Sequence, residues 1–198
     1  SDSPKYIYEY IAKNYPGKYK CVWALNDGHE VPYGAEVVKR FSFKYAYYLA
    51  VSKYFVFNVR QPLWYRKREG QVFVETWHGT PLKRLGCDIE TDSDPRQTRS
   101  HMHRRYRAKG KKVTFFPSPS PYYSEKIASA FAIGDPSVKF VASGYPRNDK
   151  LFHYTSEEIQ KKKEALHIPE GKKVLLYTPT WRDSSLDENG AFSLPDGF

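Results

Sequence analysis

Cysteine, long apolar runs and signal sequences are scarce or missing in this chain. Its 198 residues include only two cysteines, Cys21 and Cys87, which form neither a disulfide pattern nor a metal-binding pattern. No run approaches the ~20 apolar residues of a membrane-spanning helix, and the amino terminus has no basic-then-apolar signal pattern. We therefore expect a protein of a reducing, cytoplasmic compartment that neither crosses a bilayer nor is exported.

Common phosphate-binding fingerprints are missing as well. No Gly-rich dinucleotide motif follows a predicted strand, and no phosphate loop with a Gly-Lys-Ser signature occurs. A nicotinamide enzyme and an ATP-dependent enzyme are therefore disfavoured. Carboxylates do not cluster with metal-binding spacing, so we expect no tightly held metal ion.

Aromatic residues, in contrast, make up 17% of the chain and apolar residues 40%, which is enough to form a core. Short apolar runs alternate with helical segments, a pattern typical of a parallel sheet covered by helices on both faces. The predicted fold class is therefore α/β, with a Rossmann-like parallel sheet. The expected strands are 21–25, 54–59, 71–75, 113–116 and 139–142, and the expected helices are 4–15, 43–53, 95–108, 121–131 and 157–166.

The segment G-Y-P-R-N-D-K-L at 144–151 follows a strand and is interrupted by glycine and proline. We interpret it as the connection between a first domain, 1–150, and the start of a second, 151–198. Arg147 and Asp149 at this junction either pair with each other structurally or face a ligand in an interdomain cleft. The run 173–178 is expected to be the first strand of the second domain, of which only the beginning is present.

A histidine lies just beyond the expected strand 71–75, in the motif T-W-H-G-T-P-L-K-R at 76–84. The carboxyl ends of parallel strands face the ligand crevice, so His78 should be held toward a substrate. Imidazole titrates near neutral pH, and a helix beginning near Pro81 with two cations would suit a phosphate. His78 is thus a candidate general base, although a histidine that only hydrogen-bonds a loop is the alternative.

The net charge of +10 is concentrated in one segment, because eight cations occur between Arg96 and Lys112 without an acidic residue. Such a run attracts anionic lipid head groups or nucleic acid, while a solvated helix face is the structural alternative. The tyrosines at 45–48 could lie at a lipid interface or in the core. The cations expected to contact a membrane or another polyanion are Arg99, Arg104, Arg105, Arg107, Lys109, Lys111 and Lys112.

Four motifs together carry a resemblance to a known family. They are T-W-H-G-T-P-L-K-R at 76–84, S-P-S at 118–120, G-Y-P-R-N-D at 144–149 and Y-T-P-T-W-R-D at 177–183. In this order, and over almost the whole chain, they resemble the CDP-glycerol glycerophosphotransferases, which include teichoic acid primases and polymerases and related capsule polymerases. The resemblance implies a two-domain GT-B-type fold, whose first domain takes the acceptor and whose second takes the CDP-linked donor.

The resemblance also implies roles for individual residues. His78 matches the proposed catalytic base of the family. A second important histidine lies further along the donor domain in the family, beyond the end of this sequence. The implied substrate-binding residues are Gly79, Thr80, Lys83, Arg84, Arg147, Asn148, Asp149, Thr180, Trp181, Arg182 and Asp183.

The implied reaction transfers glycerol phosphate from CDP-glycerol, or a similar CDP-polyol, to the hydroxyl of a lipid-linked polyol-phosphate acceptor and releases CMP. No cofactor is expected to be tightly bound, although Mg²⁺ carried by the donor is compatible. The implied location is peripheral, on the anionic cytoplasmic face of the cell membrane, and no nucleic-acid partner is expected. Two alternatives stay open: a nucleotide-sugar glycosyltransferase of the same fold, and a non-catalytic, acceptor-binding or membrane-associated fragment.

Overall fold

The computed structural model describes residues 2–26, 30–59, 61–62, 64–91 and 98–178. Contacts divide the chain into two compact units, Ser1–His153 and Tyr154–Phe198. The first unit contains both sheets and the candidate site.

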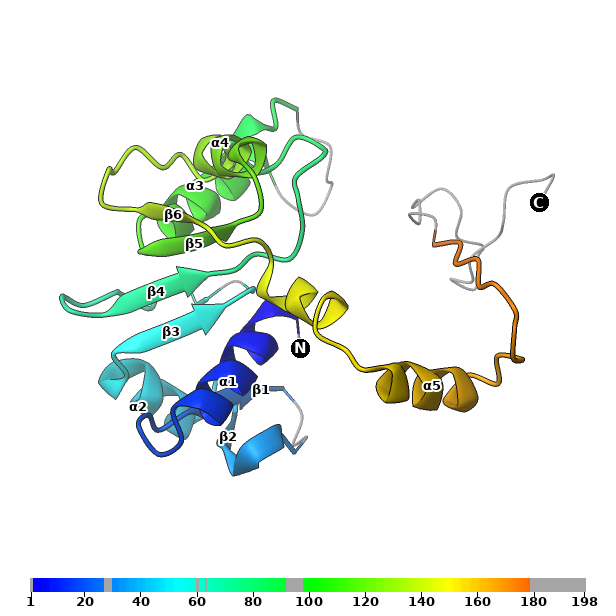
Figure 1. The fold of residues 1–198 in the computed structure, drawn as a ribbon. Coiled ribbons are helices and arrows are strands. Elements are labelled where there is room, and N and C mark those ends of the chain that lie inside the picture. The colour runs from blue at the N-terminus through cyan, green and yellow to red at the C-terminus, as the bar shows by residue number, and fades with distance from the viewer. Residues whose placement is uncertain (1, 27–29, 60, 63, 92–97, 179–198) are drawn as a thin grey trace, which may run out of the picture. The chain divides into compact units, whose positions relative to one another are not determined.

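The first unit is built on parallel strands (Figure 1). A four-stranded sheet has the order β3-β4-β5-β6, and a separate pair joins β1 to β2. Every pairing is parallel, with Phe55 opposite Phe73 and Phe116 opposite Phe140 in the larger sheet. The predicted α/β class with a parallel sheet is confirmed. The strands are β1 Val22–Leu25, β2 Glu36–Lys39, β3 Tyr54–Phe57, β4 Val72–Glu75, β5 Phe115–Ser118 and β6 Lys139–Ala142.

In the described part of the first unit, α1 precedes the strands, η3 follows them, and three α-helices and two 3₁₀ helices lie between them. The hydroxyls of Ser42, Thr98 and Ser120 each accept a backbone N–H of the first helical turn, which explains why α2, α3 and α4 begin where they do. In Figure 1, α3 and α4 lie beside β5 and β6, whereas α2 lies toward β3 and β2. The helices are α1 Ser3–Asn14, α2 Phe43–Val51, α3 Arg99–Gly110 and α4 Pro121–Ala130, with η1 Pro32–Gly34, η2 Gly86–Asp88 and η3 Pro146–Leu151.

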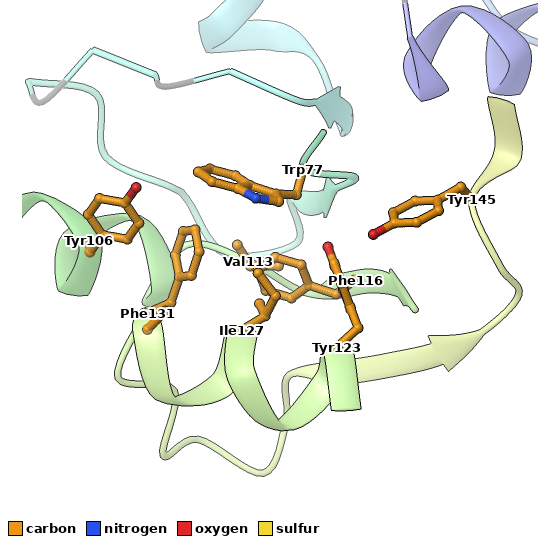
Figure 2. Close-up of a cluster of buried hydrophobic side chains, with 9 residues drawn as sticks. Trp77, Tyr106, Val113, Phe116, Tyr123, Ile127, Phe131 and Tyr145 are labelled. Atoms are coloured by element: carbon orange, nitrogen blue, oxygen red, sulfur yellow. The ribbon is translucent and has the colours of Figure 1, made fainter. Parts of the chain in front are cut away.

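The core of the first unit consists of two clusters rich in aromatic rings. The cluster under α3 and α4 includes Phe116, Ile127 and Phe131, whose exposed fraction is 0% (Figure 2). Trp77, the residue that precedes His78, belongs to this cluster, so the core packs directly against the turn that carries the candidate base. The second cluster, between α2 and the sheet, comprises Val38, Tyr45, Leu49, Phe55, Tyr65 and Phe73.

Several predicted boundaries need correction. Strand β2 was not predicted, because its sequence E-V-V-K is short and carries a charge at each end. The expected strand 113–116 lies two residues later, as β5. The prediction of a helix that starts near Pro81 is wrong, because residues 81–85 form no helix. The chain instead turns sharply at Gly86, which has a φ of 56°. A Cβ at Gly86 would lie 2.4 Å from the Tyr106 ring, so packing against α3 dictates this path.

In the second unit, the predicted charged helix is confirmed as α5, Ser156–Ala165. It begins with a capping box in which the Thr155 hydroxyl accepts the Glu158 N–H and the Glu158 carboxylate accepts the Thr155 N–H. The strand expected at 173–178 is absent, because the described part of this unit offers no strand with which it could pair. Across the residues with a described placement, no helix has the length and apolar character needed to span a bilayer.

Candidate functional site

His78 lies beyond the carboxyl end of β4 with its side chain exposed. The residue before it, Trp77, has a φ of 49°, a left-handed conformation that a bulky side chain rarely adopts. Such a conformation costs about 1–3 kcal/mol and persists only where the surroundings enforce it. The turn sends the Trp77 indole into the core, where it is 7% exposed, and leaves the His78 imidazole at the surface.

Hydrogen bonds to β3 fix the beginning of this turn. The Thr76 N–H donates to the Phe57 carbonyl at 2.7 Å, and the Thr76 hydroxyl donates to the same carbonyl at 3.0 Å. Thr76 is 1% exposed. These bonds extend the β3–β4 pairing beyond the last strand residue, so the backbone that carries His78 starts from a rigid position.

Aromatic stacking supports the imidazole directly. The His78 and Trp77 rings are stacked, with centroids 4.1 Å apart and planes inclined by 27°. The Trp77 ring in turn makes an edge contact with Phe131 at 5.3 Å. The orientation of the candidate base is therefore coupled to the core beneath α4.

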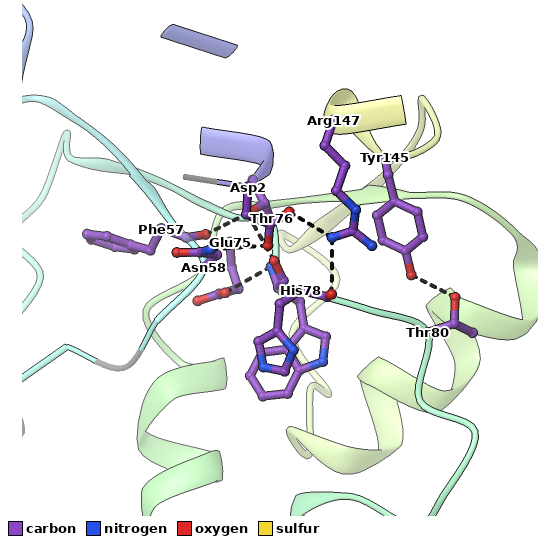
Figure 3. A network of polar contacts seen from close by, with 10 residues as sticks. Asp2, Phe57, Asn58, Glu75, Thr76, His78, Thr80, Tyr145 and Arg147 are labelled. Carbon is purple, nitrogen blue, oxygen red and sulfur yellow. Dashed lines mark hydrogen bonds and ion pairs between the residues drawn. The ribbon is translucent and has the colours of Figure 1, made fainter. Parts of the chain in front are cut away.

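Arg147, from η3, contacts the backbone of the candidate base (Figure 3). Its Nη1 donates to the His78 carbonyl at 3.0 Å and to Asp2 Oδ1 at 2.7 Å, while Asn58 Nδ2 donates to Asp2 Oδ2 at 3.1 Å. Burial acts to raise the pKa of Asp2, but the hydrogen bonds from Arg147 and Asn58 outweigh it and hold that pKa below its usual value. Arg147 thus pairs with Asp2, an acid that the sequence analysis did not single out, rather than with Asp149.

A second link connects the loop after His78 to the segment before η3. The Thr80 and Tyr145 hydroxyls share a hydrogen bond of 2.7 Å. The Arg147 guanidinium lies 4.5 Å from the centroid of the Tyr145 ring, and Tyr145 is itself 9% exposed. The predicted residues Gly79, Thr80 and Arg147 are therefore brought to the same edge of the sheet as His78.

Beneath this turn lies a buried ion pair. Glu75, the last residue of β4, is 1% exposed, and its Oε2 lies 2.8 Å from Lys109 Nζ. Burial raises the pKa of Glu75, although Lys109 and the Trp77 N–H act in the opposite direction. The Lys109 side chain is only 13% exposed, so its expected role as a polyanion contact is wrong.

The remaining predicted site residues lie on separate segments of the chain. Lys83 and Arg84 are exposed on a non-helical loop, so no helix N-terminus lies there to bind a phosphate, and Arg84 pairs with Glu90 at 2.5 Å. Asn148 is half-buried and Asp149 exposed in η3. Ser118 and Ser120 are structural, since Ser118 bonds within the turn and Ser120 caps α4. Four predicted residues, Thr180, Trp181, Arg182 and Asp183, lie outside the described residues.

The cations of α3 and of the turn that follows it do not form one uniform surface. Lys112 is partly buried, its ammonium lies 5.7 Å from the centroid of the Tyr65 ring, and desolvation lowers its pKa. Arg105 is also half-buried. Those that remain exposed are Arg99, Arg104, Arg107 and Lys111. Among the described residues, no group of three or more His, Cys, Asp or Glu side chains is placed to hold a metal ion.

Three polar residues of the site were not predicted from the sequence: Asp2, Asn58 and Glu75. Asn58 directly follows β3, but the expected strand 54–59 placed it inside the strand, so the rule that singled out His78 at the end of β4 did not apply to it. Glu75 is a charged residue that ends an apolar strand, which is a recognisable signal for a paired, buried acid. Asp2 had no local signal, because its partner Arg147 is 145 positions away.

The first unit, with its parallel sheet and with His78 beyond the carboxyl end of β4, has the architecture of a Rossmann-like domain of the GT-B-type fold. The chain is similar to a solved structure of the wall teichoic acid polymerase TagF, with a TM-score of 0.88 and 37% identity over 98% of this chain and 48% of that one. A TagF variant soaked with CDPG gives a TM-score of 0.87 over 98% of this chain and 47% of that one. The chain belongs to the family described as CDP-glycerol:poly(glycerophosphate) glycerophosphotransferase, whose sequence profile matches residues 1–195.

Curated relatives agree with this assignment. The teichoic acid poly(glycerol phosphate) polymerase of Staphylococcus epidermidis is 37% identical over 97% of this chain and 27% of its own length. The teichoic acid glycerol-phosphate transferase of Staphylococcus aureus is 32% identical over 100% of this chain and 51% of its own length. The chain therefore spans between about a quarter and a half of these relatives.

Proposed function

We propose that this chain is the acceptor-side portion of a glycerophosphotransferase. The enzyme moves glycerol phosphate from CDP-glycerol to the hydroxyl of a lipid-linked polyol-phosphate acceptor and releases CMP. The observation that carries the proposal is the exposed His78 imidazole on a turn fixed by Thr76, Trp77 and Arg147. Membership of the family and the CDPG-soaked TagF variant support the choice of donor.

In the proposed mechanism, His78 accepts the proton of the acceptor hydroxyl as that oxygen attacks the β-phosphorus of CDP-glycerol. A new phosphorus–oxygen bond forms, and the bond between the β-phosphorus and the bridging oxygen breaks, so CMP leaves with that oxygen. General-base catalysis of this kind contributes about 10²–10⁴ in rate.

Phosphoryl transfer depends mainly on positioning and charge neutralisation. Lys83 and Arg84 are exposed on the loop that follows His78, and we assign them to phosphate contacts of the acceptor or donor. Gly79 and Thr80 shape the approach to the imidazole. Mg²⁺ that arrives with the donor diphosphate would be held through the phosphate oxygens, which suits its preference for oxygen ligands.

The experiment that tests the proposal compares donors in the full-length protein that contains this sequence. CMP release from CDP-glycerol is measured with a lipid-linked glycerol phosphate acceptor, beside release from CDP-ribitol and nucleotide release from UDP-sugars. We expect turnover with CDP-glycerol to exceed turnover with UDP-sugars by at least a hundredfold. Turnover with UDP-sugars alone would instead identify a glycosyltransferase of the same fold.

We further propose that the protein contacts the anionic, cytoplasmic face of the cell membrane peripherally. Helix α2 buries Tyr45 and Leu49 but leaves a second apolar row exposed: Phe43 at 96%, Tyr47 at 59% and Val51 at 54%. Residues 37–68 contain eight Lys and Arg but no Asp or Glu, so this part of the chain carries an excess of positive charge. One of these cations, Lys44 of α2, is paired with Glu36 at 3.5 Å. An amphipathic surface of this kind suits a lipid interface, and each nearby cation contributes about 1 kcal/mol.

Vesicle co-sedimentation tests the membrane proposal. We expect the double variant Phe43→Ser/Tyr47→Ser to bind vesicles containing anionic lipid at least fivefold more weakly than the parent, because it removes both aromatic rings of the row. Tyr10→Ser is the matched control, since Tyr10 is a helical tyrosine of similar exposure, 60%, outside this row. Binding that is insensitive to both salt and lipid charge would rule out this mode of contact.

A further inference from the structure

The ion pair between Glu75 and Lys109 lies directly beneath the turn that carries His78. We propose that Glu75 and Lys109 are positioning residues, which hold Trp77 and thereby aim the His78 imidazole at the reacting hydroxyl. This inference rests on the proposed role of His78 as the base. It assigns a task in the reaction to two buried residues that touch no substrate.

Glu75 acts on the backbone of the turn. Its Oε1 accepts the Trp77 N–H at 3.0 Å, and its Oε2 pairs with Lys109 at 2.8 Å. The two carboxylate oxygens thus join the strained residue of the turn to helix α3. Burial raises the pKa of Glu75, but pairing with Lys109 favours the ionised carboxylate. An ionised acceptor binds the Trp77 N–H more strongly than a neutral oxygen does.

Lys109 acts on the Trp77 ring. Its ammonium lies 4.7 Å from the indole centroid and 5.5 Å from the Phe131 centroid, within the range of a cation–π contact. The same indole stacks on His78 with centroids 4.1 Å apart. One cation therefore contacts both the carboxylate that holds the backbone and the ring that supports the imidazole.

Stability alone does not account for this arrangement. A buried ion pair often contributes little net stability compared with an apolar pair of similar volume, because both charges are desolvated. Glu75, Lys109 and Trp77 themselves line a small, partly open pocket, so free space lies beside the indole. We expect the indole to tilt into this space once the pair is removed. A displacement of about 1 Å at a reacting group can lower the rate by up to about a hundredfold.

The decisive variant removes both charges while keeping the volume. In the full-length protein, Glu75→Gln/Lys109→Met leaves a carboxamide that is no longer held by an ammonium. We expect kcat for CMP release from CDP-glycerol to fall about tenfold to a hundredfold, with KM for the donor within about twofold of the parent. Lys109→Arg, which keeps the cation, should retain kcat within about threefold.

The matched control is the exposed pair of α5, Glu157 and Lys161, whose side chains are 76% and 71% exposed and 2.7 Å apart. Glu157→Gln/Lys161→Met should leave kcat unchanged. If the buried double variant does not fold, the single variant Lys109→Met replaces it in the same kcat measurement. Without the ammonium, Glu75 is expected to take up a proton and to remain a neutral acceptor for the Trp77 N–H. A parental kcat in the folded buried variant overturns the proposal.

A spectroscopic measurement separates this inference from the proposed function. Because Trp77 couples the pair to the imidazole, the NMR resonances of the Trp77 amide and the His78 ring should shift in the buried double variant and not in the α5 control. If His78→Ala keeps full activity, the proposed function fails, and these resonances still report whether the pair aims the ring. If His78→Ala is inactive but the double variant keeps the parental kcat and His78 resonances, the inference alone fails.

Discussion

Replacing His78 by alanine is expected to lower kcat for glycerol phosphate transfer by about 10²–10⁴-fold, the range that a general base supplies. The effect on the fold should be small, because the imidazole is exposed at the surface, where it stacks on Trp77. The measurement is CMP release from CDP-glycerol at saturating acceptor, with circular dichroism to verify the fold.

His153→Ala provides the matched control for this prediction, because His153 is another exposed histidine of the same unit and has no assigned role. It should retain the parental kcat. A loss of less than about tenfold in His78→Ala would show that another group removes the proton. In that case the turn at the end of β4 would bind the acceptor without acting as a base.

The position of His78 could be predicted from the sequence because it depends on short-range signals. The pattern of short apolar runs predicted a strand at 71–75, and the observed β4 is Val72–Glu75. It also predicted β6 at its observed bounds, Lys139–Ala142. Once the strands are parallel, the residue after each strand end must lie at one edge of the sheet. That rule needs no knowledge of which side chains pack together.

What surrounds His78 could not be predicted, because it depends on contacts between distant segments. Asn58 and Arg147 meet Asp2 across separations of 56 and 145 positions. The Thr80-Pro81 signal for a helix start was overridden at Gly86, whose backbone must pass close to Tyr106. Lys109 was counted with its exposed neighbours, since a run of cations does not show which one turns toward a buried acid.

The second large effect is expected for Arg147, whose replacement should lower both the stability of the fold and the activity. Arg147→Met keeps the aliphatic length but removes the donors to the Asp2 carboxylate and the His78 carbonyl. We expect the free energy of unfolding to fall by about 1–3 kcal/mol, because a partly buried carboxylate loses its charged partner. We also expect kcat to fall about tenfold, since the backbone of the base is no longer tethered to η3. Urea unfolding and CMP release measure the two effects.

The pH dependence of this stability loss identifies its cause. In the parent, the pKa of Asp2 is lower in the folded state than its usual value, so the pair stabilises the fold above about pH 4 and this contribution disappears as the pH falls through the folded-state pKa. The difference in unfolding free energy between parent and Arg147→Met should therefore shrink in acid. Lys5→Met, which removes a partly exposed pair with Glu9 on α1, should change stability by less than about 0.5 kcal/mol. A loss in Arg147→Met that stays constant down to strong acid would mean that Arg147 stabilises the site by packing on Tyr145 rather than by pairing with Asp2.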